Sequence, residues 1–121
     1  MLLGLRTVAY PAPDLAAGAR WYETVFGVAP YFNEPFYVGF SIGGFELGLV
    51  PDGVPGANGA VVYWGVDDIA AVLDRLLALG AAPLEPVTDV GGGIYTACVL
   101  DPFGNKLGII KNPHFRLADV R

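Results

Sequence analysis

The sequence predicts an α+β protein of two βαβββ modules, which together form an open, curved mixed sheet (a half-barrel) with a central cleft. Three observations predict this fold. Two segments with helical spacing of apolar residues each begin after an aspartate and end at a glycine. Each is preceded by one apolar, strand-like segment and followed by three. The two capping aspartates, Asp14 and Asp68, lie 54 positions apart, which indicates an internal duplication.

In the first module, a strand is expected over 2–10, ending at Pro11, and a helix runs from Leu15 to the C-cap Gly27. Glu34-Pro35 and the tight turn Gly43-Gly44 separate three further strands, over 28–33, 36–42 and 45–50. Residues 51–59 are rich in proline and glycine and read as a linker.

The second module repeats this order. A strand over 60–66 leads to a helix from Ile69 that closes at Gly80, followed by strands over 82–86, 94–100 and 106–111. Neither module could bury its sheet alone, so we expect one domain over 1–121. Module one spans about 1–52, module two about 58–112, and a tail 113–121 follows.

Composition limits the possible functions. A content of 54% hydrophobic and 16% charged residues excludes a disordered chain. The net charge is −5 and the seven Lys and Arg residues are dispersed, which argues against nucleic-acid binding. The single cysteine, Cys98, cannot form an internal disulfide, and no segment approaches the roughly 20 apolar residues of a membrane span. The first residues lack signal-peptide features, so the expected location is the cytoplasm, away from membranes.

Several short motifs occur in a specific order: 12–15 (Ala-Pro-Asp-Leu), Trp21-Tyr22, Phe26-Gly27, 66–69 (Val-Asp-Asp-Ile) and 101–105 (Asp-Pro-Phe-Gly-Asn). With this set, nearly the whole chain resembles the glyoxalase/bleomycin-resistance/extradiol-dioxygenase group, the vicinal oxygen chelate superfamily. The resemblance implies the βαβββ fold and a homodimer. It also implies that enzymes of the group hold a divalent metal with four side chains.

Those four positions fall on Thr7, Glu46, Val61 and Gly108. Only Glu46 is a typical metal ligand, because valine and glycine side chains donate nothing and a lone threonine hydroxyl is weak. We therefore expect no metal and no cofactor.

Strand alternation assigns the faces of the sheet. If Thr7, Val61 and Gly108 face the cleft, then so do Ala9, Tyr63 and Ile110. The residues that would face the helices are Val8, Tyr10, Val62, Trp64, Leu107 and Ile109, so Trp64 is expected in the core. Tyr37 and Tyr95 complete the candidate ligand-binding set, although the sequence does not fix the faces of Tyr95 and Cys98. Phe36, Val38 and Phe40 are expected on the face opposite Tyr37.

Some residues keep two interpretations. Glu46 either reaches solvent at a sheet edge or lies in the cleft, where it could accept a cation or act as a base. Cys98 is expected to be a buried small hydrophobe rather than a nucleophile, and His114 a solvated tail residue. The glycines 91–93 form a loop that could be a mobile rim of the cleft.

The sequence thus favours a metal-independent protein of the bleomycin-resistance type that sequesters a small organic ligand, aromatic or cationic, in its cleft. The alternative is a glyoxalase- or dioxygenase-like enzyme that depends on a metal or on Glu46. A module that only mediates assembly is a third possibility.

Overall fold

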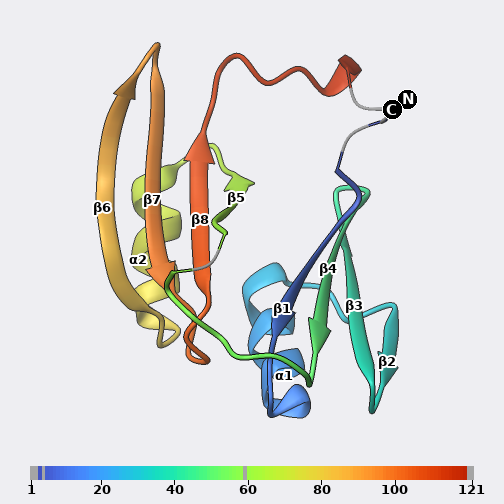
Figure 1. The fold of residues 1–121 in the computed structure, drawn as a ribbon. Helices are drawn as coiled ribbons and strands as arrows, with labels where there is room; N and C mark the ends of the chain where they lie inside the picture. Colours follow the sequence, from blue (N-terminus) through green and yellow to red (C-terminus); the bar gives the residue numbers. More distant parts are fainter. Residues whose placement is uncertain (1–2, 4, 59, 120–121) are drawn as a thin grey trace. The chain divides into compact units, whose positions relative to one another are not determined.

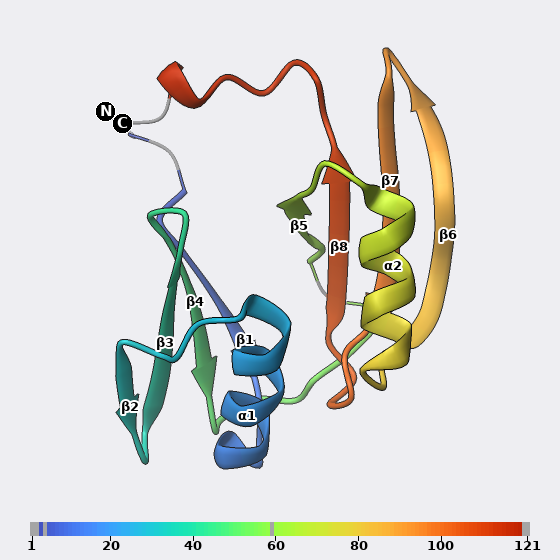
Figure 2. The same ribbon diagram turned by 180° about the vertical axis from the view of Figure 1, so that it is seen from behind.

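The computed structural model describes residues 3, 5–58 and 60–119. The chain divides between Pro55 and Gly56 into two compact units, each with one helix and one four-stranded mixed sheet (Figures 1 and 2). The break lies within the predicted linker. The α+β class and the two βαβββ modules are confirmed.

The first unit runs β1 (Thr7–Pro11), α1 (Leu15–Phe26), β2 (Phe32–Glu34), β3 (Tyr37–Ile42) and β4 (Phe45–Val50). Its strands are ordered β1-β4-β3-β2, with β1 parallel to β4 and the other pairs antiparallel. The central position of β4 determines where Glu46 lies.

The second unit runs β5 (Val62–Gly65), α2 (Ile69–Ala78), β6 (Ala82–Gly91), β7 (Ile94–Leu100) and β8 (Lys106–Lys111). Its strand order, β5-β8-β7-β6, repeats that of the first unit, and β5 is likewise parallel to β8. A short 3-10 helix, η1 (Leu117–Asp119), follows in the tail.

Both helices begin where the sequence predicts, and α1 also ends at its predicted C-cap, whereas α2 ends at Ala78 with Leu79 as its C-cap, one residue before the predicted Gly80. The carboxylates of Asp14 and Asp68 accept hydrogen bonds from the backbone N–H groups of Ala17 and Ala71, each at 3.1 Å. Gly27 has a φ of 71°, the left-handed conformation that ends many helices. None of the helices in the described part of the chain is long and apolar enough to span a membrane.

Each helix covers one face of its own sheet (Figures 1 and 2). The core lies between helix and sheet, and its largest fully buried side chains include Tyr22, Phe40, Leu47, Leu49, Leu107 and Val99. We call the face of each sheet that lies opposite its helix the distal face. The predicted half-barrel and cleft depend on how the units pack together, and they stay predictions, as does the single domain.

Five strands differ from their predicted bounds, and those expected over 36–42 and 60–66 differ by only one or two residues at an end. The strand expected over 28–33 is reduced to β2, and the one expected over 82–86 extends to Gly91. Pro83 and Pro86 are tolerated in β6 because it is an edge strand whose register with β7 shifts between Pro83 and Glu85 and between Glu85 and Thr88. The first strand begins at Thr7; residues 2 and 4 of the predicted range lie outside the described residues.

The motif over 101–105 has a structural role. The carboxylate of buried Asp101 accepts hydrogen bonds from the backbone N–H groups of Phe103 (2.9 Å) and Asn105 (2.8 Å). The Asn105 side-chain amide donates a third, at 3.2 Å. These bonds fold the turn between β7 and β8 and fix the register of β8.

Candidate functional site

The predicted faces of the first strand are confirmed. Thr7 and Ala9 are exposed on the distal face, whereas Tyr10 is buried on the helix side. Cross-strand pairing then assigns the rest of the distal face, because paired residues point the same way. Its residues are Thr7, Ala9, Pro11, Phe32, Glu34, Tyr37, Gly39, Ser41, Glu46, Gly48 and Val50.

Glu46 is half-buried on this face, in the row that pairs Thr7, Glu46 and Ser41. Since β4 lies between β1 and β3, Glu46 is not at a sheet edge. Glu46 therefore does not reach solvent at a sheet edge, which was one of the two positions that the sequence allowed.

Three hydroxyl groups donate to the Glu46 carboxylate. The Tyr31 hydroxyl donates to Oε1, the Tyr37 hydroxyl donates to Oε2 at 2.5 Å, and the Thr7 hydroxyl donates to Oε2 at 3.4 Å. Both carboxylate oxygens are therefore held by side chains from different parts of the first unit. We call Thr7, Tyr31, Tyr37 and Glu46 the hydroxyl–carboxylate cluster.

Two glycines make room for the tyrosine rings. A Cβ atom at Gly48 would lie 2.2 Å from the Tyr37 hydroxyl oxygen and 2.6 Å from its Cζ atom. A Cβ atom at Gly39 would lie 3.0 Å from Tyr31 Cε1 and 3.1 Å from Tyr37 Cε1. Both rings therefore lie against bare backbone, which lets their hydroxyl groups reach Glu46.

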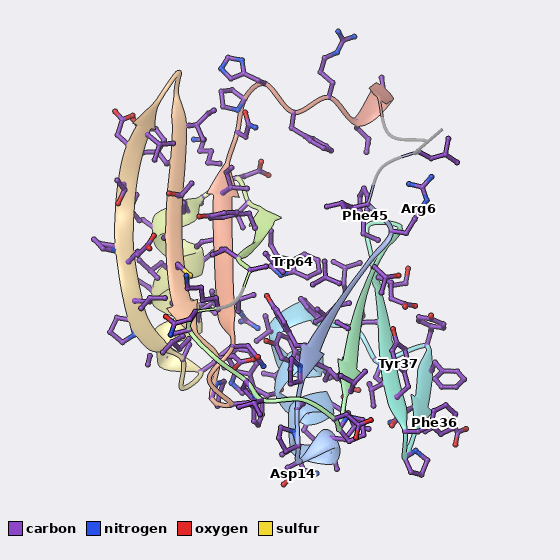
Figure 3. All side chains as sticks on the ribbon, in the orientation of Figure 1. Arg6, Asp14, Phe36, Tyr37, Phe45 and Trp64 are labelled. Carbon is purple, nitrogen blue, oxygen red and sulfur yellow. The ribbon has the colours of Figure 1, made fainter. Side chains whose placement is uncertain are left out.

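Further aromatic side chains border the cluster. The ring of Phe32 contacts those of Tyr37 and Phe36, with centroids 6.1 Å and 5.9 Å apart. Phe36 was expected to share a face with Val38 and Phe40, but it precedes β3 in a turn and is 67% exposed, whereas both of those are buried. Figure 3 shows Phe36 and Tyr37 in neighbouring positions at the β2–β3 end of the sheet, and Arg6 and Phe45 at the other end.

On the distal face of the second unit, Tyr63 is the main aromatic residue, at 44% exposure, and it pairs with Gly108. Ile110 shares this face, and Val61, which precedes β5, is half-buried. Trp64 pairs with Ile109, which places it on the helix-side face that alternation predicts, although its side chain is half-buried and not fully in the core.

The register of β7 settles two residues that the sequence left open. Cys98 pairs with Gly108 on the distal face, and it is buried. Burial raises the pKa of its thiol, and nearby Glu85 raises it further, so the thiol stays protonated and unreactive at neutral pH. Tyr95 pairs with Lys111 on the helix-side face, together with Ala97 and Val99. The register therefore places Tyr95, a candidate ligand-binding residue whose face the sequence did not fix, on the face opposite Tyr63, Gly108 and Ile110.

His114 and the glycine loop meet in the second unit. The Nε2 atom of His114 lies 2.7 Å from the carbonyl oxygen of Gly92, within the hairpin between β6 and β7. His114 is exposed, as expected for a tail residue, and it ties the tail to this hairpin.

The four positions that the resemblance assigned to a metal do not fit one. A side chain at position 108 would need a Cβ atom 2.7 Å from the Val62 carbonyl oxygen and 2.7 Å from Tyr63 Cδ1. The Glu46 oxygens already accept three hydroxyl hydrogen bonds. Across residues 3, 5–58 and 60–119, no group of three or more His, Cys, Asp or Glu residues could hold an ion.

Sequence reasoning missed Tyr31, which lies in the segment before β2. The sequence did contain one indication that aromatic rings lie over this face: two glycines, Gly39 and Gly48, occur inside neighbouring apolar strands at positions of the distal face. Glycine inside a strand often marks a close approach of another group, and here that group is the pair of tyrosine rings.

The family model for the glyoxalase/bleomycin resistance protein/dioxygenase superfamily matches residues 4–109. The chain belongs to this superfamily. No curated protein sequence matches it significantly.

Solved structures of this superfamily share the fold. A glyoxalase-related enzyme from Fulvimarina pelagi is 26% identical, with a TM-score of 0.79, covering 99% of this chain and 96% of that one. A lactoylglutathione lyase from Agrobacterium tumefaciens is 25% identical, with a TM-score of 0.75 and coverage of 96% and 100%. A glyoxalase/bleomycin resistance protein from Albidiferax ferrireducens T118 is 18% identical, with a TM-score of 0.72 and coverage of 90% and 98%.

Proposed function

We propose that this superfamily member is a metal-independent binding protein of the bleomycin-resistance type, which sequesters a small organic ligand against the hydroxyl–carboxylate cluster. One observation carries the proposal: both oxygens of Glu46 are held by phenolic hydroxyl groups on a face whose glycines keep aromatic rings accessible. A few convergent polar groups beside aromatic surface are typical of organic-ligand sites.

Ala9 lies beside the cluster on the same face and is proposed to contact the ligand there. On the distal face of the second unit, taken by itself, Val61, Tyr63, Gly108 and Ile110 stay candidate ligand-contacting residues. We also propose a homodimer in the cytoplasm, for which light scattering should give the mass of two chains.

Three small aromatic probes that differ in charge test the proposal: benzylamine, benzyl alcohol and benzoate. Each is titrated into the isotope-labelled protein with and without EDTA, while the amide signals of Gly39 and Gly48 are followed by NMR. At least one probe should shift these signals saturably, and to the same extent in EDTA. The proposal fails if no probe shifts them, or if saturable shifts occur only after Zn²⁺, Ni²⁺, Mn²⁺ or Fe²⁺ is added.

The alternative is an enzyme on the same fold, and the likeness to a structure named lactoylglutathione lyase favours it. Here a metal site would require ligands other than Val61 and Gly108, or Glu46 would act as a general base. Turnover of lactoylglutathione by the purified protein, lost in Glu46→Gln, would establish this alternative. We expect no turnover above that of buffer.

A further inference from the structure

In all three hydrogen bonds of the cluster, the hydroxyl group is the donor and Glu46 is the acceptor. Each hydroxyl group of Tyr31, Tyr37 and Thr7 carries one proton, and each proton is directed to a Glu46 oxygen. A hydroxyl that has donated its only proton can offer a ligand lone pairs alone. The cluster therefore presents acceptors to a ligand and no donor.

The charges of the same face agree with this polarity. The distal face of the first unit carries two carboxylates, Glu34 and Glu46, and none of its described residues is Lys, Arg or His. The chain as a whole has a net charge of −5. These carboxylates would repel an anionic ligand and attract a cationic one.

The aromatic rings complete the chemistry. Tyr31 is 63% exposed and Phe32 is 38% exposed, and the rings of Phe32 and Tyr37 contact each other. Aromatic faces attract cations and pack against other rings. A ligand with a positive group beside an apolar ring would use both features.

We infer that the ligand of this site is a protonated organic amine, whose N–H groups donate to the hydroxyl oxygens of the cluster and whose charge is balanced by Glu46. The inference rests on the proposed function and adds the chemical class of the ligand. A neutral or acidic ligand that offers mainly acceptors would find no donor among the cluster's side chains.

The same three probes test the inference, because they share a ring and differ in the polar group. Charge-assisted hydrogen bonds are stronger than neutral ones, so benzylamine should bind at least about tenfold more tightly than benzyl alcohol, and benzoate should bind weakest. Glu46→Gln should remove most of the preference for benzylamine and leave benzyl alcohol binding unchanged. Glu23→Gln is the matched control: it removes the same charge from an exposed position of α1 and should preserve the preference.

If Glu46→Gln does not fold, Tyr37→Phe replaces it, since that change keeps the ring and removes one hydroxyl acceptor. It should also weaken benzylamine binding selectively. Tighter binding of benzyl alcohol or benzoate than of benzylamine overturns the inference and leaves the proposed function standing. The inference is also overturned if the variants keep the preference. If no probe binds, the proposed function itself fails.

Discussion

At the scale of single residues, the site depends on two glycines as much as on its polar groups. Gly48 leaves the space in which the Tyr37 hydroxyl meets Glu46, and a methyl group there would overlap that hydroxyl. The ring is half-exposed, so it can swing away instead of straining the backbone. The main consequence of adding a side chain is then the loss of a hydrogen bond.

We therefore predict that Gly48→Ala lowers the free energy of unfolding by about 1 kcal/mol, the typical contribution of one hydrogen bond. It should also abolish benzylamine binding. Gly56→Ala is the control, because a Cβ atom there meets nothing within 4 Å. Denaturant unfolding and the probe titration measure the two effects. A Gly48→Ala protein that binds like the wild type would contradict the assigned position of the Tyr37 ring.

Cys98 provides a prediction on pH. Burial raises the pKa of its thiol, so the unfolded chain loses this proton at a lower pH than the folded chain does. In that range the unfolded state binds fewer protons, and stability falls as the pH rises above the ordinary thiol pKa of about 8.5.

The Cys98 thiol should lower the free energy of unfolding by at most about 1.4 kcal/mol for each pH unit of this range. This decrease should be absent from Cys98→Ala, because that variant lacks the thiol and keeps all other titrating groups. Unfolding free energies of both proteins from neutral to alkaline pH measure the difference. Equal pH slopes would show that the thiol is not desolvated. The folded wild type should also resist thiol alkylation.

At the scale of secondary-structure elements, local signals predicted the helices well. Each helix begins after an aspartate that accepts a hydrogen bond from the third residue after it, an interaction within four residues of sequence. Asp14→Ala and Asp68→Ala should each cost about 1 kcal/mol of stability. Asp74→Ala removes the same charge from an exposed position inside α2 and should cost nothing. If all three variants lost the same stability, the effect would come from the removed charge and not from helix capping.

Strands were predicted less well, because their bounds depend on neighbours that are distant in sequence. β6 continues to Gly91 because β7 offers it a partner, despite Pro83 and Pro86. Alternation assigned Thr7, Ala9, Tyr63 and Trp64 correctly, since each lies in a regular strand. It failed for Phe36, which lies in a turn before β3 begins. The face of Tyr95 required the β7–β8 register, which no local pattern fixes.

At the scale of the whole molecule, the two units repeat one fold but differ in chemistry. In the first, a tyrosine lies over a β4 glycine and reaches a carboxylate; in the second, Tyr63 lies against Gly108 on β8. The sequence identified the superfamily and Glu46, because short motifs and a carboxylate in an apolar strand are visible locally. It could not identify the partners of Glu46, because Tyr31, Tyr37 and Thr7 meet only once the sheet forms.

We propose that this chain binds its ligand with side chains and not with a metal. Transition-metal content per chain, measured on protein purified without chelators and after incubation with Zn²⁺, Ni²⁺, Mn²⁺ or Fe²⁺ followed by desalting, tests it most directly. We predict far less than one ion per chain in every case, with no difference between the wild type and Glu46→Gln. One tightly held ion per wild-type chain that is lost in Glu46→Gln would contradict the account.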